Sequence, residues 1–264
     1  MAAIVIRDMD ENSEHFVGTC SHVGESGEID ASAAVRIDYL KCKWRQGLRV
    51  KVAFLDQAPV GFLYLLPIAI SPWGPLGKDL NVVPCLYVIE RGKGKGVGRA
   101  LLVAAEDESR RAGAKGVVIY GYYHDFWFMP ASYFEKLGFA PVQRRGNEAL
   151  MWKVLDPSAE PPQFMTKKYE FKPVADKIVV DLFWNRLCLT SCIEARRVRE
   201  VAAEFGSKVV LNEYPADEAS VLARYHLARG IFVNGREIGW GYEAPREGIR
   251  DAINEAIKKT LSQS

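Results

Sequence analysis

The chain has 264 residues, enough for two domains of ordinary size, and a formal net charge of +2 with 26% charged residues. Outside one glycine-rich segment there is no basic block that would indicate nucleic acid, and no apolar run is long enough to cross a membrane. The first residues become charged at Arg7, too early for an export signal, and the five cysteines are an odd number, so we expect a cytoplasmic protein without a disulfide framework.

The first part of the chain alternates strand-like and helix-like patterns. A strand is expected at residues 4–7, and residues 10–48 are mostly helical, most clearly over 33–44. The next expected elements are a hairpin of strands 50–55 and 60–70, a strand over 82–89, a helix over 97–112, a strand over 116–123, a short helix over 130–137 and a strand over 149–154.

A turn-rich stretch at residues 156–162 marks a change in composition. We therefore place one domain at residues 1–155, a linking arm at 156–176 and a second domain at 177–264. The second domain is expected to hold strands 178–183 and 209–213, helices 191–205 and 217–225, a hairpin over 231–238 that turns at Asn234-Gly235, and a closing helix over 246–261.

The segment Arg91–Arg99 reads Arg-Gly-Lys-Gly-Lys-Gly-Val-Gly-Arg between an expected strand and an expected helix. Glycines allow the backbone to come close to a ligand, and the N-terminus of a helix favours a negative charge. Lysines and arginine add positive charge, so the segment predicts a phosphate or pyrophosphate site. No Ser or Thr follows a lysine as a Walker A loop requires, and no strand–helix–strand unit with a correctly placed acidic residue supports a dinucleotide fingerprint.

This segment resembles motif A of the GNAT family of N-acetyltransferases, Arg/Gln-x-x-Gly-x-Gly/Ala, with Lys93 in the first place and Gly96 and Gly98 as the two glycines. A second stretch, Tyr133–Phe139, is similar to the motif B pattern Leu-Tyr-Glu-Lys-x-Gly-Phe of the same family. The resemblance covers about residues 4–155. It implies an α/β (α+β) acyl-CoA N-acyltransferase fold with a mixed central sheet, and the transfer of acetyl from acetyl-CoA to a primary amine by direct attack.

The resemblance also implies which residues hold acetyl-CoA. Backbone groups of the strand before the loop would bind the acetyl carbonyl and pantetheine, and the loop would bind the pyrophosphate. Carried over residue by residue, these are Leu86, Tyr87, Val88, Lys93, Gly94, Lys95, Gly96, Val97, Gly98 and Arg99, with Trp127 at the place of the asparagine that the family has upstream of motif B.

The chain departs from the family's pattern at the catalytic residues. Glu90 ends the expected strand and is our candidate base, directly or through water; it could equally be a solvated carboxylate paired with a neighbouring cation. The family tyrosine that protonates the leaving thiolate is replaced by Phe134. Tyr133 lies one residue earlier, about 100° around the helix, where packing is the commoner role. Other donors are possible among Tyr122, Tyr123 and His124, or the thiolate leaves unaided.

The second domain resembles thioredoxin and glutaredoxin. Phe183–Cys188 has the spacing of the thioredoxin run before its reactive cysteine, and Gly230–Gly239 is similar to a glutaredoxin segment. The redox pair is displaced, because Cys192 lies four residues after Cys188 instead of three, and Arg229 stands where the family has a cis-proline. The module is therefore either an unusual thiol site or a redox fold kept for binding or regulation.

The whole chain resembles the YoaP-like group of acetyltransferases, for which fold and cosubstrate follow but the acceptor does not. A metal site formed by Cys188, Cys192 and a remote histidine such as His226 is disfavoured. We expect acetyl-CoA and an amine as partners and no metal, and a homodimer is compatible with the resemblance.

Overall fold

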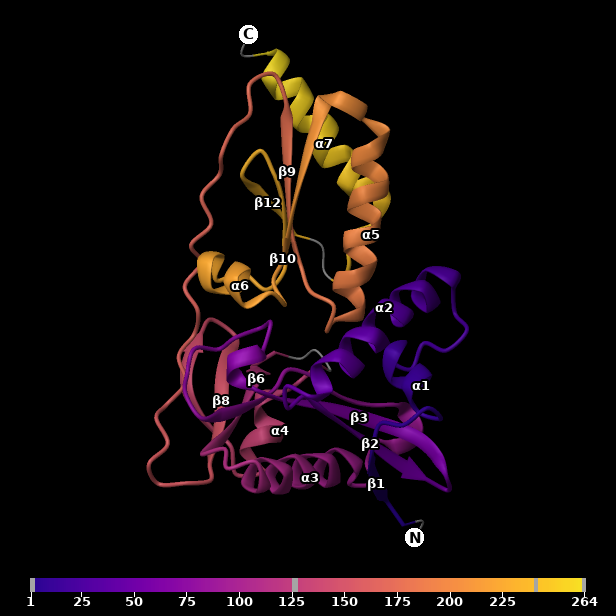
Figure 1. The fold of residues 1–264 in the computed structure, drawn as a ribbon, viewed down its shortest axis with the longest axis vertical. Helices are drawn as coiled ribbons and strands as arrows, with labels where there is room; N and C mark the ends of the chain where they lie inside the picture. The colour runs from indigo at the N-terminus through magenta and orange to yellow at the C-terminus, as the bar shows by residue number, and fades with distance from the viewer. Residues whose placement is uncertain (1–2, 125–127, 240–241, 263–264) are drawn as a thin grey trace. The chain divides into compact units, whose positions relative to one another are not determined.

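The structure is a computed structural model that describes residues 3–124, 128–239 and 242–262 (Figure 1). The chain packs as two units, one made of residues 1–23 and 40–165 and the other of residues 24–39 and 166–264. Helix α2 (Gly27–Trp44) therefore contributes its first part to the second unit. A boundary near residue 156, placed from composition, does not anticipate this contribution.

The first unit is built on a sheet in the order β1-β2-β3-β4-β6-β8-β7, with β5 paired to β3. Only β4 and β6 run parallel among these pairs, so the expected mixed sheet and α/β class are confirmed. The strands are β1 (Val5–Asp8), β2 (Arg49–Leu55), β3 (Ala58–Pro67), β4 (Leu80–Val83), β5 (Leu86–Val88), β6 (Gly116–Tyr122), β7 (Ala140–Arg145) and β8 (Glu148–Val154).

Helices cover both faces of this sheet (Figure 1). Alternate residues of β3 point to opposite faces: Leu63 and Leu65 join a core with α3 and α4, whereas Phe62 packs against Phe16 of α1 with ring centroids 6.0 Å apart. The helices and short 3₁₀ turns of this unit are α1 (Glu14–Gly18), α3 (Val97–Arg111), α4 (Ala131–Glu135), η1 (Ile68–Ile70) and η2 (Glu90–Gly92).

Two expectations for the first unit need correction. The single strand expected over 82–89 is two strands, because Pro84, which has no N–H to donate, separates β4 from β5. Strand β7 was not expected at all. It pairs with β8 along the edge of the sheet, and its mostly exposed residues, Arg144 and Arg145 among them, lack the apolar alternation that marks a half-buried strand.

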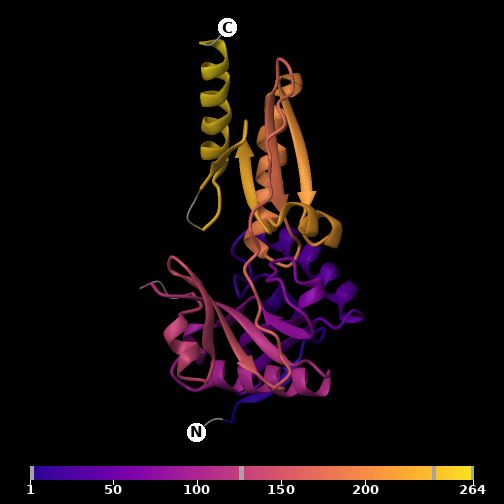
Figure 2. The same ribbon diagram turned by 90° about the vertical axis from the view of Figure 1, so that its left-hand side faces the viewer.

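The second unit has the sheet order β10-β9-β11-β12, with β9 parallel to β10 and antiparallel to β11 (Figure 2). Its element order is the one expected from the sequence. The elements are β9 (Ile178–Trp184), α5 (Leu189–Glu204), η3 (Gly206–Lys208), β10 (Val209–Pro215), α6 (Ala219–Tyr225), β11 (Gly230–Val233), β12 (Arg236–Ile238) and α7 (Arg246–Leu261).

The two faces of the second sheet are covered differently. Val180 and Leu182 of β9 pack with α5 and α7 in one apolar core. On the opposite face Phe183 contacts Tyr225 of α6 and Tyr169, whose hydroxyl donates a hydrogen bond to Asp181 (2.7 Å). The extended segment that precedes β9 thus closes a face that helices leave partly open.

Within the described ranges, no helix combines the length and apolar character needed to cross a bilayer.

Candidate functional site

The glycine-rich segment enters α3 through left-handed backbone conformations. Gly94 has φ +70°, and Gly96, the N-cap of α3, has φ +86°, a region that residues with a side chain rarely adopt. Gly96 has no side chain with which to cap the helix. The N–H groups of a first helical turn have no acceptor within the helix, and the helix dipole is positive at that end. The N-terminus of α3 is therefore suited to bind an anion.

Strand β5 offers a free backbone edge beside this helix. The carbonyl of Cys85 and the N–H of Ile89 are hydrogen-bonded to β3, which fixes the register of β5. Since antiparallel pairing turns alternate residues toward the partner strand, the N–H of Tyr87 faces β3 and those of Leu86 and Val88 face away. Among the described strands β6 pairs with β4 and β8, so this edge of β5 stays open.

A pocket of about 430 Å³ lies between the edge of β5, the glycine-rich segment, the N-terminus of α3 and α4. Segments some forty residues apart in the chain meet there. Of the residues that the sequence assigns to acetyl-CoA, those that line the pocket are Leu86, Tyr87, Val88, Lys93, Gly94, Gly96, Val97, Gly98 and Arg99.

Two assigned residues are not part of this lining. Lys95 is exposed and lies outside the pocket. Trp127 falls outside the described residues. The assignments of the cosubstrate-binding residues therefore converge on one cavity apart from these two positions.

Glu90 lies in η2 at the start of the glycine-rich segment. Its side chain is 87% exposed, and its carboxylate is 2.7 Å from the ammonium nitrogen of Lys93. This hydrogen bond and the negative charge of Glu90 raise the pKa of Lys93 above its ordinary value. Glu90, the candidate base, is not among the residues that line the pocket.

Tyr133 reaches the pocket from α4. Its hydroxyl lies over Gly98, so close that a Cβ at position 98 would collide with it. Burial raises the pKa of this hydroxyl, and the positive charge of Arg99 lowers it. Phe134, which stands in the place of the family's tyrosine, has 1% of its surface exposed and packs in the core. Both rings line the pocket, and of the two only Tyr133 carries a hydroxyl that can donate a proton.

The alternative proton donors Tyr122, Tyr123 and His124 do not line the pocket. Burial raises the pKa of Tyr122 to about 12, and its ring stacks on His124 with centroids 5.3 Å apart. The hydroxyl of Tyr123 donates a hydrogen bond to Glu135 (2.5 Å), which raises the pKa of that tyrosine. Of the four donor candidates, Tyr133 is the one that lines the pocket in the described chain.

The pocket also includes residues that sequence reasoning missed. Met129, Pro130, Lys136 and Leu137 complete its wall on the side of α4. Lys136 belongs to the Glu-Lys-x-Gly-Phe part of motif B, so a cation beside the loop could have been inferred from the same match. Met129 carries no such signal, because its position depends on a left-handed backbone (φ +48°) before α4.

The two candidate redox cysteines differ in environment. Cys188 is the N-cap of α5 and half-buried, and its sulfur is 3.0 Å from the hydroxyl of Thr190. Cys192 is buried and donates a weak hydrogen bond from its thiol to the carbonyl of Asn185 (3.7 Å). Burial raises the pKa of Cys192 to about 12. Both are free thiols.

Arg229 lies next to this cysteine site. Its guanidinium donates hydrogen bonds to the hydroxyl of Thr190 (2.9 Å), the carboxylate of Glu194 (2.7 Å) and the carbonyl of Tyr242 (2.8 Å). These hydrogen bonds hold the cation in place between α5 and the segment before α7.

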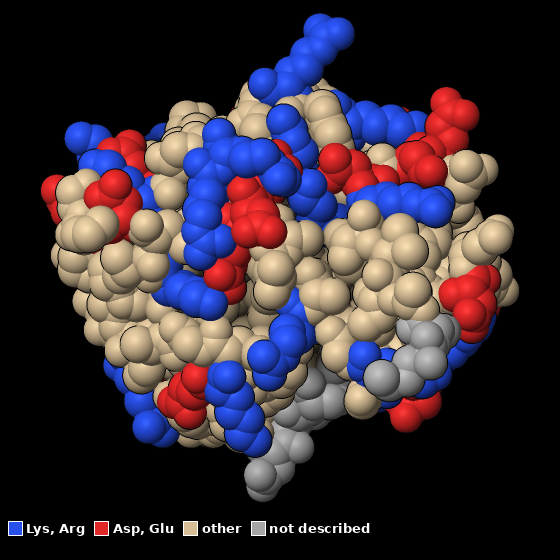
Figure 3. Space-filling view, turned by 90° about the horizontal axis from the view of Figure 1, so that it is seen from below, with Lys and Arg blue, Asp and Glu red and all other residues tan. Residues whose placement is uncertain are grey.

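Other features bear on the expected partners. His226 ends α6, and its ring nitrogen is 3.0 Å from the carbonyl of Thr166. No group of three or more metal-ligating side chains occurs within residues 3–124, 128–239 and 242–262. On the face drawn in Figure 3, basic and acidic side chains are interspersed.

Of the comparisons with known proteins, only the one with solved structures finds matches. No family model matches the chain, and no curated protein matches it. An N-acetyltransferase from Thermoplasma acidophilum in complex with coenzyme A is 18% identical with a TM-score of 0.41, over 58% of this chain and 99% of that one. A GNAT-family acetyltransferase from Staphylococcus aureus is 16% identical with a TM-score of 0.44, over 58% and 100%.

A GNAT-family acetyltransferase from Brucella melitensis in complex with acetyl-CoA is 18% identical with a TM-score of 0.41, over 61% of this chain and 93% of that one. Because the identities and TM-scores are this low, function is inferred from the residues of this chain alone.

Proposed function

We propose that the first unit is an acetyl-CoA-dependent N-acetyltransferase of the GNAT type that acts on a primary amine. The observation that carries the proposal is the uncapped N-terminus of α3, entered through Gly94 and Gly96, which opens into the pocket beside the free edge of β5. A helix N-terminus supplies N–H donors to a pyrophosphate, and a free strand edge supplies them to an extended pantetheine arm. The two features adjoin in one cavity, as the motif A match requires.

The proposed roles follow from position. The first-turn N–H groups of α3 receive the pyrophosphate, with Lys93 and Arg99 adding charge-assisted hydrogen bonds. The outward N–H groups of Leu86 and Val88 bind the pantetheine amides and polarise the acetyl carbonyl. Tyr87 has no such role, because its N–H faces β3 and its ring packs near that of Phe62, with ring centroids 6.0 Å apart.

The reaction is a direct acyl transfer. The amine nitrogen forms a bond to the acetyl carbon, the carbon–sulfur bond breaks, and the coenzyme A thiolate leaves. Glu90 accepts the proton that the amine loses, after Lys93 has turned from Glu90 to the pyrophosphate. Tyr133 donates a proton to the leaving sulfur. The products are an acetylated amine and free coenzyme A.

The test follows coenzyme A thiol release from acetyl-CoA with a panel of amines: spermidine, free lysine, an aminoglycoside and a lysine peptide. Wild type is compared with Glu90→Gln and with a matched control, Asp56→Asn. Asp56 is an exposed carboxylate whose partner is Arg91 of the same segment (3.4 Å). We expect amine-dependent release that Glu90→Gln lowers by about a hundredfold and Asp56→Asn leaves unchanged.

The proposed reaction and the assignment of Glu90 as the base can be contradicted separately. Wild-type protein that releases no thiol with any amine contradicts the proposed function. Turnover that survives in Glu90→Gln removes the base assignment and leaves the transfer reaction in place.

For the second unit we propose a thioredoxin-like module used for binding or regulation, as in the YoaP-like group. The sheet order β10-β9-β11-β12 with α5 and α7 on one face supports the fold assignment. The burial of Cys192 and its raised pKa favour binding over thiol–disulfide chemistry, because a thiol must ionise to attack a disulfide. A redox pair of Cys188 and Cys192 is the alternative.

A further inference from the structure

The charged side chains that line the pocket beside α3 are all basic. Of the described residues that line it, Lys93, Arg99 and Lys136 are cations and none is acidic. A cavity with charge of one sign on its walls favours a ligand with several charges of the other sign. The proposed function uses Lys93 and Arg99 beside the pyrophosphate and leaves Lys136 without a role.

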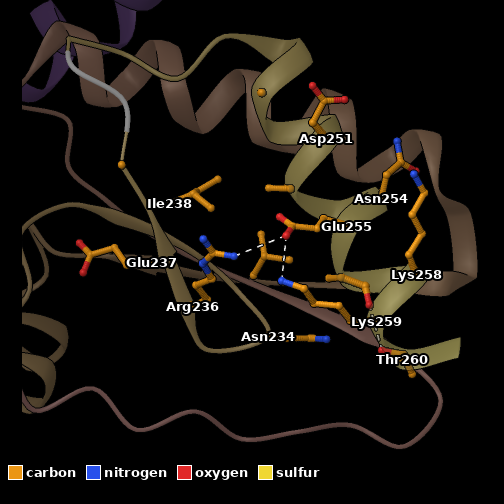
Figure 4. Close-up of a pocket in the computed structure, with 15 residues that line it drawn as sticks. Asn234, Arg236, Glu237, Ile238, Asp251, Asn254, Glu255, Lys258, Lys259 and Thr260 are labelled. Carbon is orange, nitrogen blue, oxygen red and sulfur yellow. Dashed lines mark hydrogen bonds and ion pairs between the residues drawn. The ribbon is translucent and has the colours of Figure 1, made fainter. Parts of the chain in front are cut away.

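A larger groove in the second unit has no such excess of charge. It has a volume of about 990 Å³ and lies between the β11–β12 hairpin and α7 (Figure 4). Basic and acidic side chains line it in equal number: Arg236, Lys258, Lys259, Glu237, Asp251 and Glu255. Of these two cavities, only the pocket beside α3 favours an anion by its charge.

Lys136 reaches that pocket from α4. It is the C-cap of α4 and keeps helical backbone angles (φ −62°, ψ −15°), so it lies on the same side of the helix as Tyr133, three residues earlier. Tyr133 marks the part of α4 that is near β5, because a Cβ built on Gly98 would meet both the Tyr133 hydroxyl and, at 3.7 Å, the side chain of Leu86.

The end of α4 lies along the middle of α3. The carbonyl of Leu137 accepts a hydrogen bond from the ammonium of Lys153 (3.1 Å), which also donates to the carboxylate of Glu106 in α3 (2.8 Å). Lys136, which precedes Leu137, is therefore farther from β5 than Tyr133 is. A ligand that enters along β5 and places its pyrophosphate at the N-terminus of α3 has Lys136 beyond the pyrophosphate.

The ammonium of Lys136 is available to such a ligand. Lys136 is exposed, and no ion pair within the described ranges involves it. Lys93, in contrast, pairs with Glu90 (2.7 Å). A phosphate that arrives at Lys136 displaces water and breaks no ion pair.

We propose that Lys136 binds the 3′-phosphate of acetyl-CoA, and that the enzyme thereby prefers the complete coenzyme to acetyl donors that lack this phosphate. The inference rests on the proposed function. The 3′-phosphate is carried by the ribose, on the far side of the pyrophosphate from pantetheine, and Lys136 lies on that side of the pocket. A contact between an ammonium and a phosphate is a charge-assisted hydrogen bond, stronger than one between neutral groups.

The test is calorimetric titration of the full chain, at low ionic strength, with coenzyme A and with 3′-dephospho-coenzyme A. The two ligands differ in this phosphate alone. The proteins are wild type, Lys136→Gln, Lys93→Gln and a matched control, Lys78→Gln. Lys78 is an exposed lysine of the first unit that does not line the pocket, so its replacement removes the same charge elsewhere.

We expect wild type to bind coenzyme A about tenfold more tightly than 3′-dephospho-coenzyme A, the effect of one charge-assisted hydrogen bond. Lys136→Gln should bind the two ligands alike, because it loses affinity for coenzyme A alone. Lys93→Gln should weaken both by the same factor, since both carry the pyrophosphate. Lys78→Gln should leave both Kd values unchanged.

Four results would overturn the proposal. Wild type that binds both ligands equally does not recognise the 3′-phosphate. A preference that survives in Lys136→Gln assigns that phosphate to another residue, and equal weakening of both ligands in Lys136→Gln places Lys136 on the pyrophosphate. A preference that Lys78→Gln lowers as much reflects net charge. Wild type that binds neither ligand contradicts the proposed function itself, and the inference with it.

Discussion

The hydroxyl of Tyr133 lies directly over the Cα of Gly98, in contact so close that no Cβ fits between them. Gly98 is in the first turn of α3, and Tyr133 comes from α4, which follows β6. This contact joins the two segments that match motifs A and B. The backbone of Gly98 is helical and does not itself require glycine, so a Cβ at position 98 would act by displacing the Tyr133 hydroxyl.

Gly98→Ala should therefore displace Tyr133 and narrow the pocket. Overpacking of this kind costs about 1–3 kcal/mol, so we expect a lower free energy of unfolding and at least about tenfold weaker binding of acetyl-CoA. Denaturant unfolding and calorimetric titration measure the two effects.

The double variant Gly98→Ala/Tyr133→Phe serves as the control. Without the hydroxyl, the nearest atom of the ring is the former Cζ, 3.3 Å from the new Cβ, and a small shift can accommodate that contact. The double variant should regain much of the stability lost in Gly98→Ala. If it is as unstable as Gly98→Ala alone, the clash is not with this hydroxyl.

Tyr133→Phe alone tests the proton donor. Burial raises the pKa of Tyr133, so its hydroxyl stays protonated at neutral pH and can donate. We expect kcat for thiol release to fall by about a hundredfold while the Kd of acetyl-CoA changes by no more than about threefold. An unchanged kcat would mean that the thiolate leaves unaided and that Tyr133 only packs against α3.

The two cysteines of the second unit should react differently. With its pKa raised to about 12, Cys192 has about one part in ten thousand as thiolate at pH 8. Iodoacetamide should modify Cys188 in the native protein and leave Cys192 unmodified until the chain is denatured, as peptide mass analysis would show. A two-hydrogen mass loss under mild oxidant that Cys192→Ser abolishes would instead support the redox alternative.

Acid should destabilise the first unit through Glu108 on α3. Hydrogen bonds from Arg111 and the buried Lys51 lower the pKa of Glu108 from 4.5 to about 2. A carboxylate with a depressed pKa in the folded state stabilises the protein above pH 4.5 and loses that contribution as pH falls toward 2. Glu108→Gln should flatten the fall in stability across this range, whereas Asp107→Asn, a charge removal at an exposed site of the same helix, should leave it steep.

The sequence predicted those parts of the fold in which local signals agree. The glycine-rich entry to α3 and the Asn234-Gly235 hairpin have specific backbone chemistry, and both occur as expected. Strand β7 was not predicted, because its mostly exposed residues show no alternation of apolar and polar side chains. The packing of residues 24–39 with the second unit was not predicted either. It depends on contacts between residues far apart in the chain, such as the ion pair between Glu28 and Arg197.

The parts of the candidate site whose backbone a motif fixes could be predicted from the sequence. The parts that depend on the conformations of side chains could not. Leu86, Val88 and the loop residues converge on the pocket because strand, turn and helix place them there. The partner of Glu90 and the position of the Tyr133 hydroxyl depend on rotamers and on neighbouring elements. No spacing rule encodes these.

The central claim, that the loop before α3 binds the pyrophosphate of acetyl-CoA, is tested most directly by calorimetric titration of the purified chain with acetyl-CoA beside coenzyme A, ATP and NAD. The account predicts micromolar binding of acetyl-CoA and of coenzyme A, which share the pyrophosphate and pantetheine, with ATP and NAD much weaker. Absence of acetyl-CoA binding would contradict it.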